Sequence, residues 1–412
     1  MITFKGISRR TNKYYISLKW YVNNFLAFKR FKVVYYIRRI DWYLANQDFY
    51  HHRLFSERFI NTCFEMLLIN SSYRFTKDLT EDQIYLLIDS VIHSNQKLEL
   101  KLCVLKYIYQ YSILYGGFKT SEYIRTRWLS FLWGEGIHSE FFHIESLKAG
   151  VELGFFNDVK LRIKSLLRHD LSNADLLYKI SEFCDFDRRI EVKSIPESFS
   201  KLLLNRNLVI VGPAVDFSPS THLKGIDKPL VVMTNFVTNS KCMSDYTPDI
   251  SYYNSRKILT NKQGIFKTLD SLEFGCFKSE SDMLNMNFIK KPEKLRTIEN
   301  VADIMVNNTG PNAIQNIVYD LWKNGVDKKI FLRGVNLFLS KNSYKSGYWD
   351  DVNISSISKA IRWHDPFSNF AILKHYYNSN LISPSDDFDW IFNLSMAEYA
   401  ERLDEIYVNA IK

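Results

Sequence analysis

Paired cysteines are the first feature that the sequence lacks. The five cysteines are scattered along 412 residues, and none forms a Cys-x-x-Cys pair. Domains that depend on disulfide bonds have closely spaced cysteines, and zinc sites have short ligand spacings. The sequence therefore predicts neither a disulfide framework nor a zinc site, and it favours a reducing compartment.

Long apolar runs are also missing. No run approaches the roughly 18 apolar residues that a transmembrane helix requires, and the first residues do not form the apolar segment of a signal peptide. Hydrophobic residues nevertheless make up 46% of the chain, which is typical of a folded globular protein. We expect a cytoplasmic protein.

Acidic residues are absent from the first 40 residues, while ten Lys and Arg residues occur before Asp41. Aromatic residues such as Trp20, Phe25 and Tyr35 lie between these cations. The mixture favours an arm over residues 1–40 that contacts an anionic membrane surface. Nucleic acid would attract the same charges, but we expect the membrane as the partner and no nucleic acid. A solvated basic helix that packs on its neighbour is the alternative.

Glycine and proline are scarce between residues 42 and 185, and apolar residues recur there at helical spacing. This pattern predicts an all-α domain over residues 41–190. Within it, residues 145–186 alternate helical segments with a Gly-containing turn and an Asn/Asp turn. The alternation is similar to the helical hairpins of tetratricopeptide-like (TPR-like) arrays, which form docking surfaces. The charged stretch 186–201 is the predicted boundary.

A different pattern begins after residue 200. Short apolar runs at 208–211, 230–233, 251–253 and 330–332 alternate with helical patterns. Such alternation indicates βαβ units and a largely parallel sheet. We therefore predict an α/β, Rossmann-like domain over residues 200–412, preceded by the all-α domain.

Candidate binding residues follow three of these runs. Gly212 and Pro213 follow the first, Asn235 the second and Asn254 the third. Ligands of doubly wound sheets bind beyond the carboxyl ends of the strands, so we expect these residues to converge. The alternative is that the asparagines only end strands, because asparagine suits turns.

A second group of candidates lies between residues 302 and 338. Asn308, Thr309 and Gly310 precede a helical pattern, whose first backbone N–H groups would form an anion site with the threonine. Alternatively, Thr309 only caps the helix. The strand-like run at 330–332 leads into Asn336.

The stretch 339–363 has no strong period and follows a strand end, which is typical of a lid beside a ligand. It carries Tyr344 and Tyr348, and His364 comes next, before a helical pattern. The positive end of a helix dipole favours a neutral imidazole, so His364 is a candidate general base. The alternative is that His364 only caps the helix.

The order of these pieces resembles the bacterial CMP-sialic acid-dependent sialyltransferases of glycosyltransferase family forty-two. Residues 211–214 are similar to that family's Gly-Pro loop, although its usual Gly-Asn-Gly-Pro-Ser is shortened here. Residues 234–236 are similar to its Cys-Asn-Gln-Phe strand end, and residues 252–255 to its Phe-Phe-Asn-Pro. The resemblance covers residues 205 to about 385.

Further matches follow in the family's order. Residues 308–310 match its Thr-Ser-Gly helix start, and residues 333–337 match its Cys-Gly-Ile-Asp-Phe strand end. Its tyrosine-bearing lid falls on Tyr344 or Tyr348, and its catalytic histidine on His364.

The resemblance implies a role for the matched residues. Asn235 and Asn254 would bind the cytidine and phosphate or the reacting sugar. Thr309 and Gly310 would hold the sugar carboxylate or phosphate. The lid tyrosines would donate to the leaving phosphate, and His364 would be the base.

Two Asp-x-Asp spacings raise the question of a metal. A diphosphate leaving group would need a divalent cation, and Asp185 with Asp187, or Asp387 with Asp389, have the spacing that such sites use. Neither pair follows a central strand, so we interpret both as turn or cap carboxylates and expect no metal and no cofactor. Asp216 is the one carboxylate candidate for a covalent, retaining mechanism, with a loop or cap role as its alternative.

The leading expectation is a glycosyltransferase on the inner face of the membrane. It would move a sialic acid or Kdo-type sugar from a CMP-sugar donor to a glycan or glycolipid acceptor, such as lipooligosaccharide, O-antigen or capsule. A metal-dependent nucleotide-diphosphate-sugar transferase is the alternative enzyme. A non-catalytic helical-repeat interaction protein is the alternative from a different class.

Overall fold

The computed structural model describes residues 81–94, 98–114, 118–135, 140–167, 174–186, 197–212, 226, 228–237, 247–284, 286, 292–299, 301–306, 313–339 and 364–407. By its internal contacts the chain divides into two compact units, residues 1–111 and 112–412. The described elements of the first unit are α4 (Glu81–His93) and the greater part of α5 (Leu98–Leu114). Leu87, Val91 and Leu105 of these helices are buried.

The second unit contains both helices and strands. In chain order its described elements are α6 (Phe118–Glu135), α7 (Glu140–Glu152), α8 (Phe156–Leu166), α9 (Ala174–Phe183), α10 (Glu197–Leu203), β1 (Leu208–Val211), β2 (Leu230–Thr234), β3 (Ile250–Tyr253), α11 (Ser255–Thr260), α12 (Lys262–Leu269), β4 (Phe274–Phe277), α13 (Glu280–Leu284), the short 3-10 helix η4 (Pro292–Lys294), β5 (Leu295–Thr297), η5 (Ala302–Ile304), α14 (Ala313–Lys323), β6 (Ile330–Arg333), α16 (Pro366–Asn378), β7 (Ile382–Ser383), α17 (Asp386–Asn393) and α18 (Met396–Tyr407).

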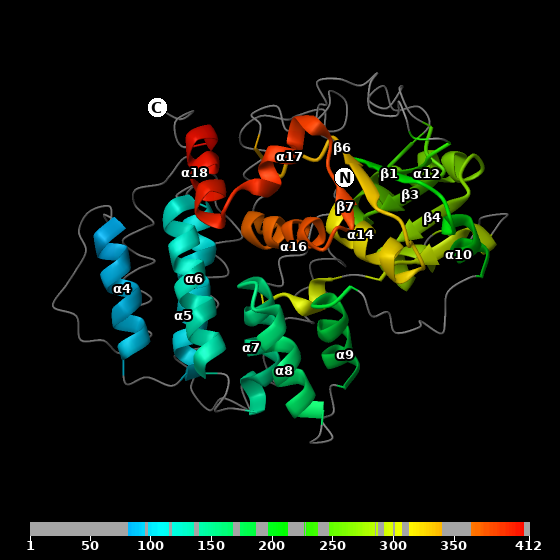
Figure 1. Cartoon of the computed structure of the whole chain (residues 1–412). Coiled ribbons are helices and arrows are strands. Elements are labelled where there is room, and N and C mark those ends of the chain that lie inside the picture. Colours follow the sequence, from blue (N-terminus) through cyan, green and yellow to red (C-terminus); the bar gives the residue numbers. More distant parts are fainter. Residues whose placement is uncertain are drawn as a thin grey trace, which may run out of the picture. The chain divides into compact units, whose positions relative to one another are not determined.

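The described strands form one sheet in the order β5-β4-β3-β2-β1-β6-β7, and every neighbouring pair is parallel (Figure 1). The four strands predicted from the sequence are confirmed as β1, β2, β3 and β6. From β1 the chain adds strands on one side as far as β5, then returns to add β6 and β7 on the other side. This α/β arrangement is doubly wound and Rossmann-like.

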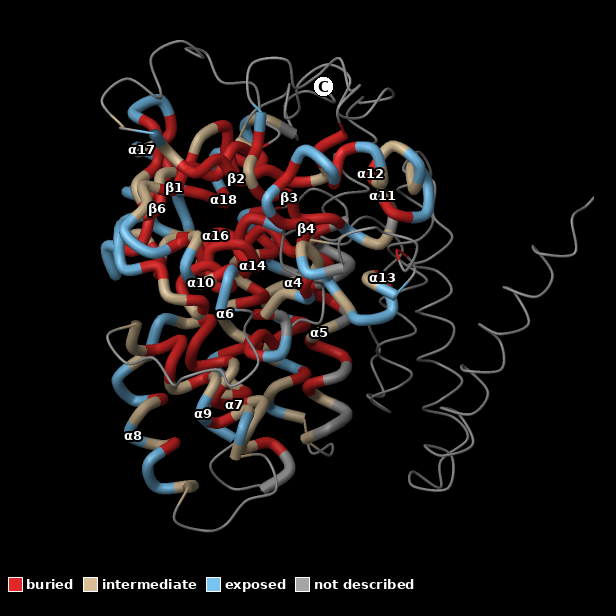
Figure 2. The backbone as a smooth tube through the Cα atoms, turned by 90° about the vertical axis from the view of Figure 1, so that its right-hand side faces the viewer, coloured by how far each residue is buried: buried red, intermediate tan, exposed pale blue. Residues whose placement is uncertain are grey.

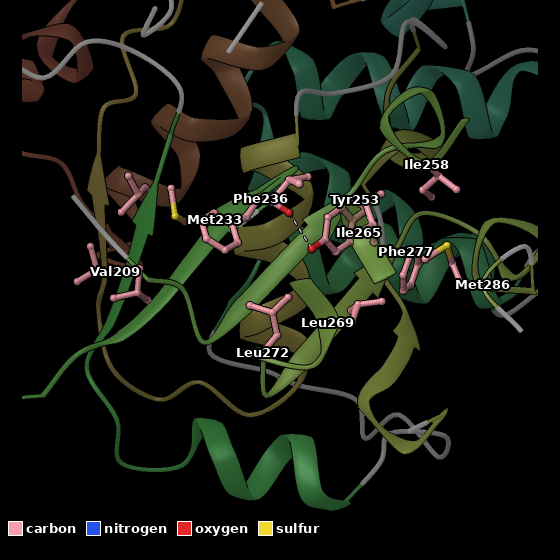
Figure 3. Close-up of a cluster of buried hydrophobic side chains, with 13 residues drawn as sticks. Val209, Met233, Phe236, Tyr253, Ile258, Ile265, Leu269, Leu272, Phe277 and Met286 are labelled. Carbon is pink, nitrogen blue, oxygen red and sulfur yellow. Dashed lines mark hydrogen bonds between the residues drawn. The ribbon is translucent and has the colours of Figure 1, made fainter. Parts of the chain in front are cut away.

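Successive strand residues point to opposite faces of the sheet, and each face has its own cover. On one face, Val209, Tyr253 and Phe277 belong to a buried apolar cluster with Ile258 of α11 and Ile265 of α12 (Figure 3). In Figure 2 the buried colour continues along β1 to β4 and along most of α16, whereas α8 and α17 carry exposed stretches. The sheet is therefore the core of the second unit.

The opposite face carries a buried polar cluster under α14. The Asp320 carboxylate accepts from Arg296 Nη1 and Nη2 at 2.5 and 2.9 Å, from the Tyr252 hydroxyl at 2.7 Å and from the Glu299 backbone N–H at 2.8 Å. Arg296 is 7% exposed and Asp320 is fully buried. These donors offset the cost of burying the charges, and they attach β3 and β5 to α14.

Helices α6 to α9 belong to the same compact unit as the sheet. Lys323 at the end of α14 forms a buried ion pair with Glu182 of α9, with Nζ 2.5 and 2.6 Å from the two carboxylate oxygens. The three helices of the predicted hairpin pattern are present as α7, α8 and α9, and Gly154 in the first turn has a φ of 81°. The second predicted turn lies outside the described residues. The predicted boundary, residues 186–201, begins after α9 and overlaps α10, and it stays a prediction.

Ser385 and Asp386 before the last helical pattern predict one helix that runs to the C-terminus, and this prediction is wrong. The chain instead breaks at Leu394, whose ψ of 142° is extended, and forms α17 and α18. Ser395 and Glu398 form a capping box, in which Ser395 N donates to Glu398 Oε2 at 2.6 Å and Glu398 N donates to Ser395 Oγ at 3.2 Å. Ser385 occupies the expected N-cap position of α17, but its side chain makes no capping hydrogen bond.

His375, in the last turn of α16, contacts α8 and α9. Its Nε2 lies 2.7 Å from the Phe183 carbonyl oxygen, and its ring stacks on Phe156 with 3.7 Å between centroids. Burial lowers the pKa of His375 from 6.5 to about 4, although the bond to the Phe183 carbonyl acts in the opposite direction. The imidazole is therefore neutral in the folded protein at neutral pH and donates to that carbonyl.

The depressed pKa of His375 predicts acid sensitivity. Below pH 6.5 the unfolded chain binds a proton that the folded chain does not bind until about pH 4, so stability falls as pH falls through this window. Between pH 7 and pH 5 the wild type should lose about 2 kcal/mol more free energy of unfolding than His375→Gln, whose amide retains a donor for Phe183. Urea unfolding at both pH values measures the difference. Equal losses in the two proteins would contradict the assignment.

Candidate functional site

The strand order reverses between β1 and β6, and this is where doubly wound sheets bind ligands. The two carboxyl ends lie against each other: Gly212 N donates to the Arg333 carbonyl oxygen at 2.7 Å. A Cβ added at Gly212 would lie 2.4 Å from the carbonyl oxygen of Gly334, which itself has a φ of 61°. Only glycine at position 212 allows the two strand ends to approach this closely.

Asn235 and Asn254 come together at the neighbouring carboxyl ends, as the sequence predicts. Asn235 has a left-handed φ of 55°, and its Oδ1 accepts from Asn254 N at 3.1 Å. Asn254 caps α11, since its Oδ1 accepts from Lys257 N at 2.8 Å. Both side-chain oxygens therefore have the turn and cap roles that asparagine suits. A role in ligand binding stays a prediction.

Residues of β3 also hydrogen-bond to the turn after β2. The Tyr253 hydroxyl donates to the Phe236 carbonyl oxygen at 2.9 Å, which is the dashed line in Figure 3, and Phe236 N donates to Ser251 Oγ at 3.2 Å. Burial raises the pKa of the Tyr253 hydroxyl, so it stays protonated and remains a donor. Asn235, next to Phe236, is thus held by main-chain and side-chain bonds from β3.

A carboxylate that the sequence analysis missed lies beyond β3 and β4. Asp282 of α13 is 9% exposed, and its Oδ2 accepts from Ser255 Oγ at 2.6 Å. Asp282 N donates to Ser279 Oγ at 3.2 Å. The spacing Ser279-x-x-Asp282 is the signature of a helix start, and it was the available signal. Ser255 follows Asn254 directly, so this pair fixes the start of α11 from a second side.

Asn336 lies just beyond the carboxyl end of β6 and is 8% exposed. Its Oδ1 accepts from Phe338 N at 3.2 Å, and its carbonyl oxygen accepts from Leu339 N at 2.8 Å. Leu337 and Phe338 both have positive φ values, 49° and 68°. The segment after β6 is therefore a tight turn at the same edge of the sheet as Gly212.

His364 is partly buried and precedes Asp365, the N-cap of α16. Asp365, which follows it, is the N-cap: its Oδ1 accepts from Phe367 N at 2.9 Å and Ser368 N at 3.2 Å, and Pro366 is the first helical residue. A helix that connects parallel strands runs antiparallel to them, so its N-terminus lies at the carboxyl edge. The turn that carries His364 thus belongs to this edge, and Asp365 rather than His364 caps the helix.

Several predicted residues lie outside the described part of the chain. They are Pro213, Asp216, Asn308, Thr309, Gly310, Tyr344, Tyr348 and the arm over residues 1–40. Their predicted roles stay predictions.

One aspartate of each Asp-x-Asp spacing, Asp389 and Asp185, has a structural partner. Tyr377 donates to Asp389 Oδ1 at 3.2 Å, and Lys160 forms an ion pair with Asp185 at 3.2 Å. Burial raises the pKa of the Cys276 thiol to about 12, so this cysteine is not a nucleophile at neutral pH. Within the described residues, no three His, Cys, Asp or Glu side chains are grouped as metal ligands.

Comparisons with known proteins give no match among protein-family models, curated proteins or solved structures. Among the described helices, none has the length and apolar character needed to cross a membrane. The candidate site therefore rests on the arrangement of the strand ends.

Gly212→Ala tests the close approach of β1 and β6. The new Cβ would meet the backbone of Gly334, which cannot rotate away, so we expect a loss of about 1–3 kcal/mol in the free energy of unfolding. Gly134→Ala in α6 is the control, because a Cβ there has no atom within 4 Å. Urea unfolding should show no loss for this control. Equal stability of the two variants would refute the steric constraint at the strand ends.

Proposed function

We propose that the protein is a glycosyltransferase that moves a sialic acid or Kdo-type sugar from a CMP-sugar to a cell-surface glycan or glycolipid. The main support is the carboxyl edge of the sheet, where Gly212 and Asn336 flank the reversal of strand order and Asn235 contacts Asn254. These residues are the ones that the resemblance to family forty-two sialyltransferases singles out, and they occur in the family's order.

The chemistry of the proposed reaction suits this set of groups. A CMP-sugar departs through a single phosphate, so the site needs hydrogen-bond donors for the phosphate, a partner for the sugar carboxylate and a base for the acceptor hydroxyl. Asn235, Asn254 and Asn336 would contact the donor, with Asn308, Thr309 and Gly310 beside the anionic groups and Tyr344 or Tyr348 on the leaving phosphate. His364 would remove the acceptor proton in one inverting step.

Helices α7 to α9 would bind the acceptor. In this proposal α7, α8 and α9 are TPR-like hairpins that bind the glycan acceptor or its carrier, and the basic arm contacts anionic lipid on the inner face of the membrane. Deletion of residues 1–40 should then remove binding to anionic liposomes and leave nucleotide binding intact.

Nucleotide selectivity gives the first test of the proposal. A ligand that binds only the folded protein stabilises it, by about 2.7 kcal/mol at 100 times its Kd. CMP should therefore raise the melting temperature, while UMP and ADP at the same concentration should not. Stabilisation by a nucleoside diphosphate only with a divalent cation would favour the alternative transferase. No response to any nucleotide would favour the non-catalytic interaction protein.

His364→Ala tests the proposed base. Loss of a positioned general base should lower kcat about 100-fold or more and leave CMP affinity nearly unchanged. His375→Gln, in the last turn of α16, keeps a donor for the Phe183 carbonyl oxygen and is the matched control, so it should retain turnover. Turnover and CMP binding are measured for both variants. A His364 variant with wild-type kcat between pH 5 and pH 9 would remove this residue from the mechanism.

A further inference from the structure

Glu152, the last residue of α7, is a buried carboxylate with partners on three separate segments. It is 4% exposed. Its Oε1 accepts from Val306 N at 2.7 Å, and its Oε2 accepts from Arg125 Nη2 of α6 and from Ser368 Oγ of α16, both at 2.8 Å. Arg125 Nη2 also lies 3.3 Å from the Glu152 carbonyl oxygen. One carboxylate therefore joins α6 and α7 to the chain after η5 and to α16.

The partners of Glu152 reach the turn that carries His364. Ser368 is the third residue of α16, and its backbone N–H is held by Asp365, the residue after His364. Asn369 continues the same turn, since its Nδ2 donates to the Asp365 carbonyl oxygen at 2.6 Å. The hydroxyl of Ser368 thus fixes the first turn of α16 relative to α7.

A second buried ion pair joins α9 to α14, at a distance from the carboxyl edge of the sheet. Glu182 of α9 contacts Lys323, which is in the last turn of α14. A crossover helix ends at the amino edge of the sheet, so this pair lies away from the carboxyl edge. Glu152 and Glu182 are both buried, and each joins helices α6–α9 to elements that pack on the sheet. Glu152 contacts the first turn of α16, which follows His364.

We propose that Glu152 is a positioning residue for His364, acting through Ser368 and Asp365. This inference rests on the proposed transferase function. Removal of the Ser368 contact frees the first turn of α16 to shift and rotate, and a displacement of about 1 Å in a catalytic group is enough to lower the rate up to about 100-fold. Binding of the nucleotide, which uses other segments, is unaffected.

Ser368→Ala is the sharpest variant, because it removes one contact and leaves the Arg125–Glu152 pair in place. Glu152→Gln removes the charge, and Arg125→Met/Glu152→Met removes both charges without leaving either one buried alone. Glu182→Gln is the matched control. For each variant, kcat, the KM for CMP-sugar, the pH dependence of kcat and the melting temperature are measured.

We expect Ser368→Ala and the Glu152 variants to lower kcat about tenfold or more, to keep the donor KM within about twofold, and to shift the acid limb of the kcat profile. Glu182→Gln should lower the melting temperature and leave kcat and its pH profile unchanged. If Glu152→Gln does not fold, Ser368→Ala and the double variant still decide the outcome.

The possible failures are distinguishable. A wild type that does not turn over CMP-sugar refutes the proposed function, and the role of Glu152 in it falls with that function. An active wild type in which Ser368→Ala and the double variant match Glu182→Gln in kcat and pH profile refutes the positioning role alone. Glu152 would then be a structural partner of Arg125.

Discussion

The second unit depends on the complete burial of β1. This strand has β2 on one edge and β6 on the other, and every one of its residues is buried. Parallel neighbours on both sides require crossover connections. After β5 the chain returns to the other side of β1, and this change in the order of the strands places α14 on the face opposite α11 and α12. The N-termini of the crossover helices then share one edge with the carboxyl ends of the strands. The candidate site is a consequence of this topology.

Two of the four strands that the sequence predicts have almost purely apolar residues. β1 and β2 are runs of Val, Leu, Ile and Met, with Thr234 at the end of β2, and such runs predict a strand without any knowledge of the fold. β4, Phe274–Phe277, contains a glycine in its middle, and β7 has only two residues. β5 has Arg296 at its centre, which looks like a surface residue until Asp320, 24 residues away, supplies its counter-charge. Partners far apart in sequence override local pattern at such positions.

The candidate site, like the strands, was predictable only where the signal is local in the sequence. Gly212, Asn235 and Asn254 follow apolar runs directly, so their placement at one edge requires only a parallel sheet. The Asp282–Ser255 pair and the Glu152–Ser368 pair, 27 and 216 residues apart, depend on how helices pack on the sheet. A single sequence contains no signal for such contacts. The break at Leu394 is different, because the Ser395 to Glu398 capping box is visible in the sequence.

The position of α16 follows from contacts at both of its ends. Ser368 in its first turn binds Glu152 of α7, and His375 in its last turn binds the Phe183 carbonyl of α9 and stacks on Phe156 of α8. The first contact is made by a buried carboxylate and the second by a buried imidazole. The sheet side adds Gln315 Nε2 to the Asn369 carbonyl oxygen at 3.2 Å and the Tyr376 hydroxyl to the Gln315 carbonyl oxygen at 3.1 Å. Because the helical segments hold both ends of α16, they set where its first turn, and therefore His364, lies along the carboxyl edge of the sheet.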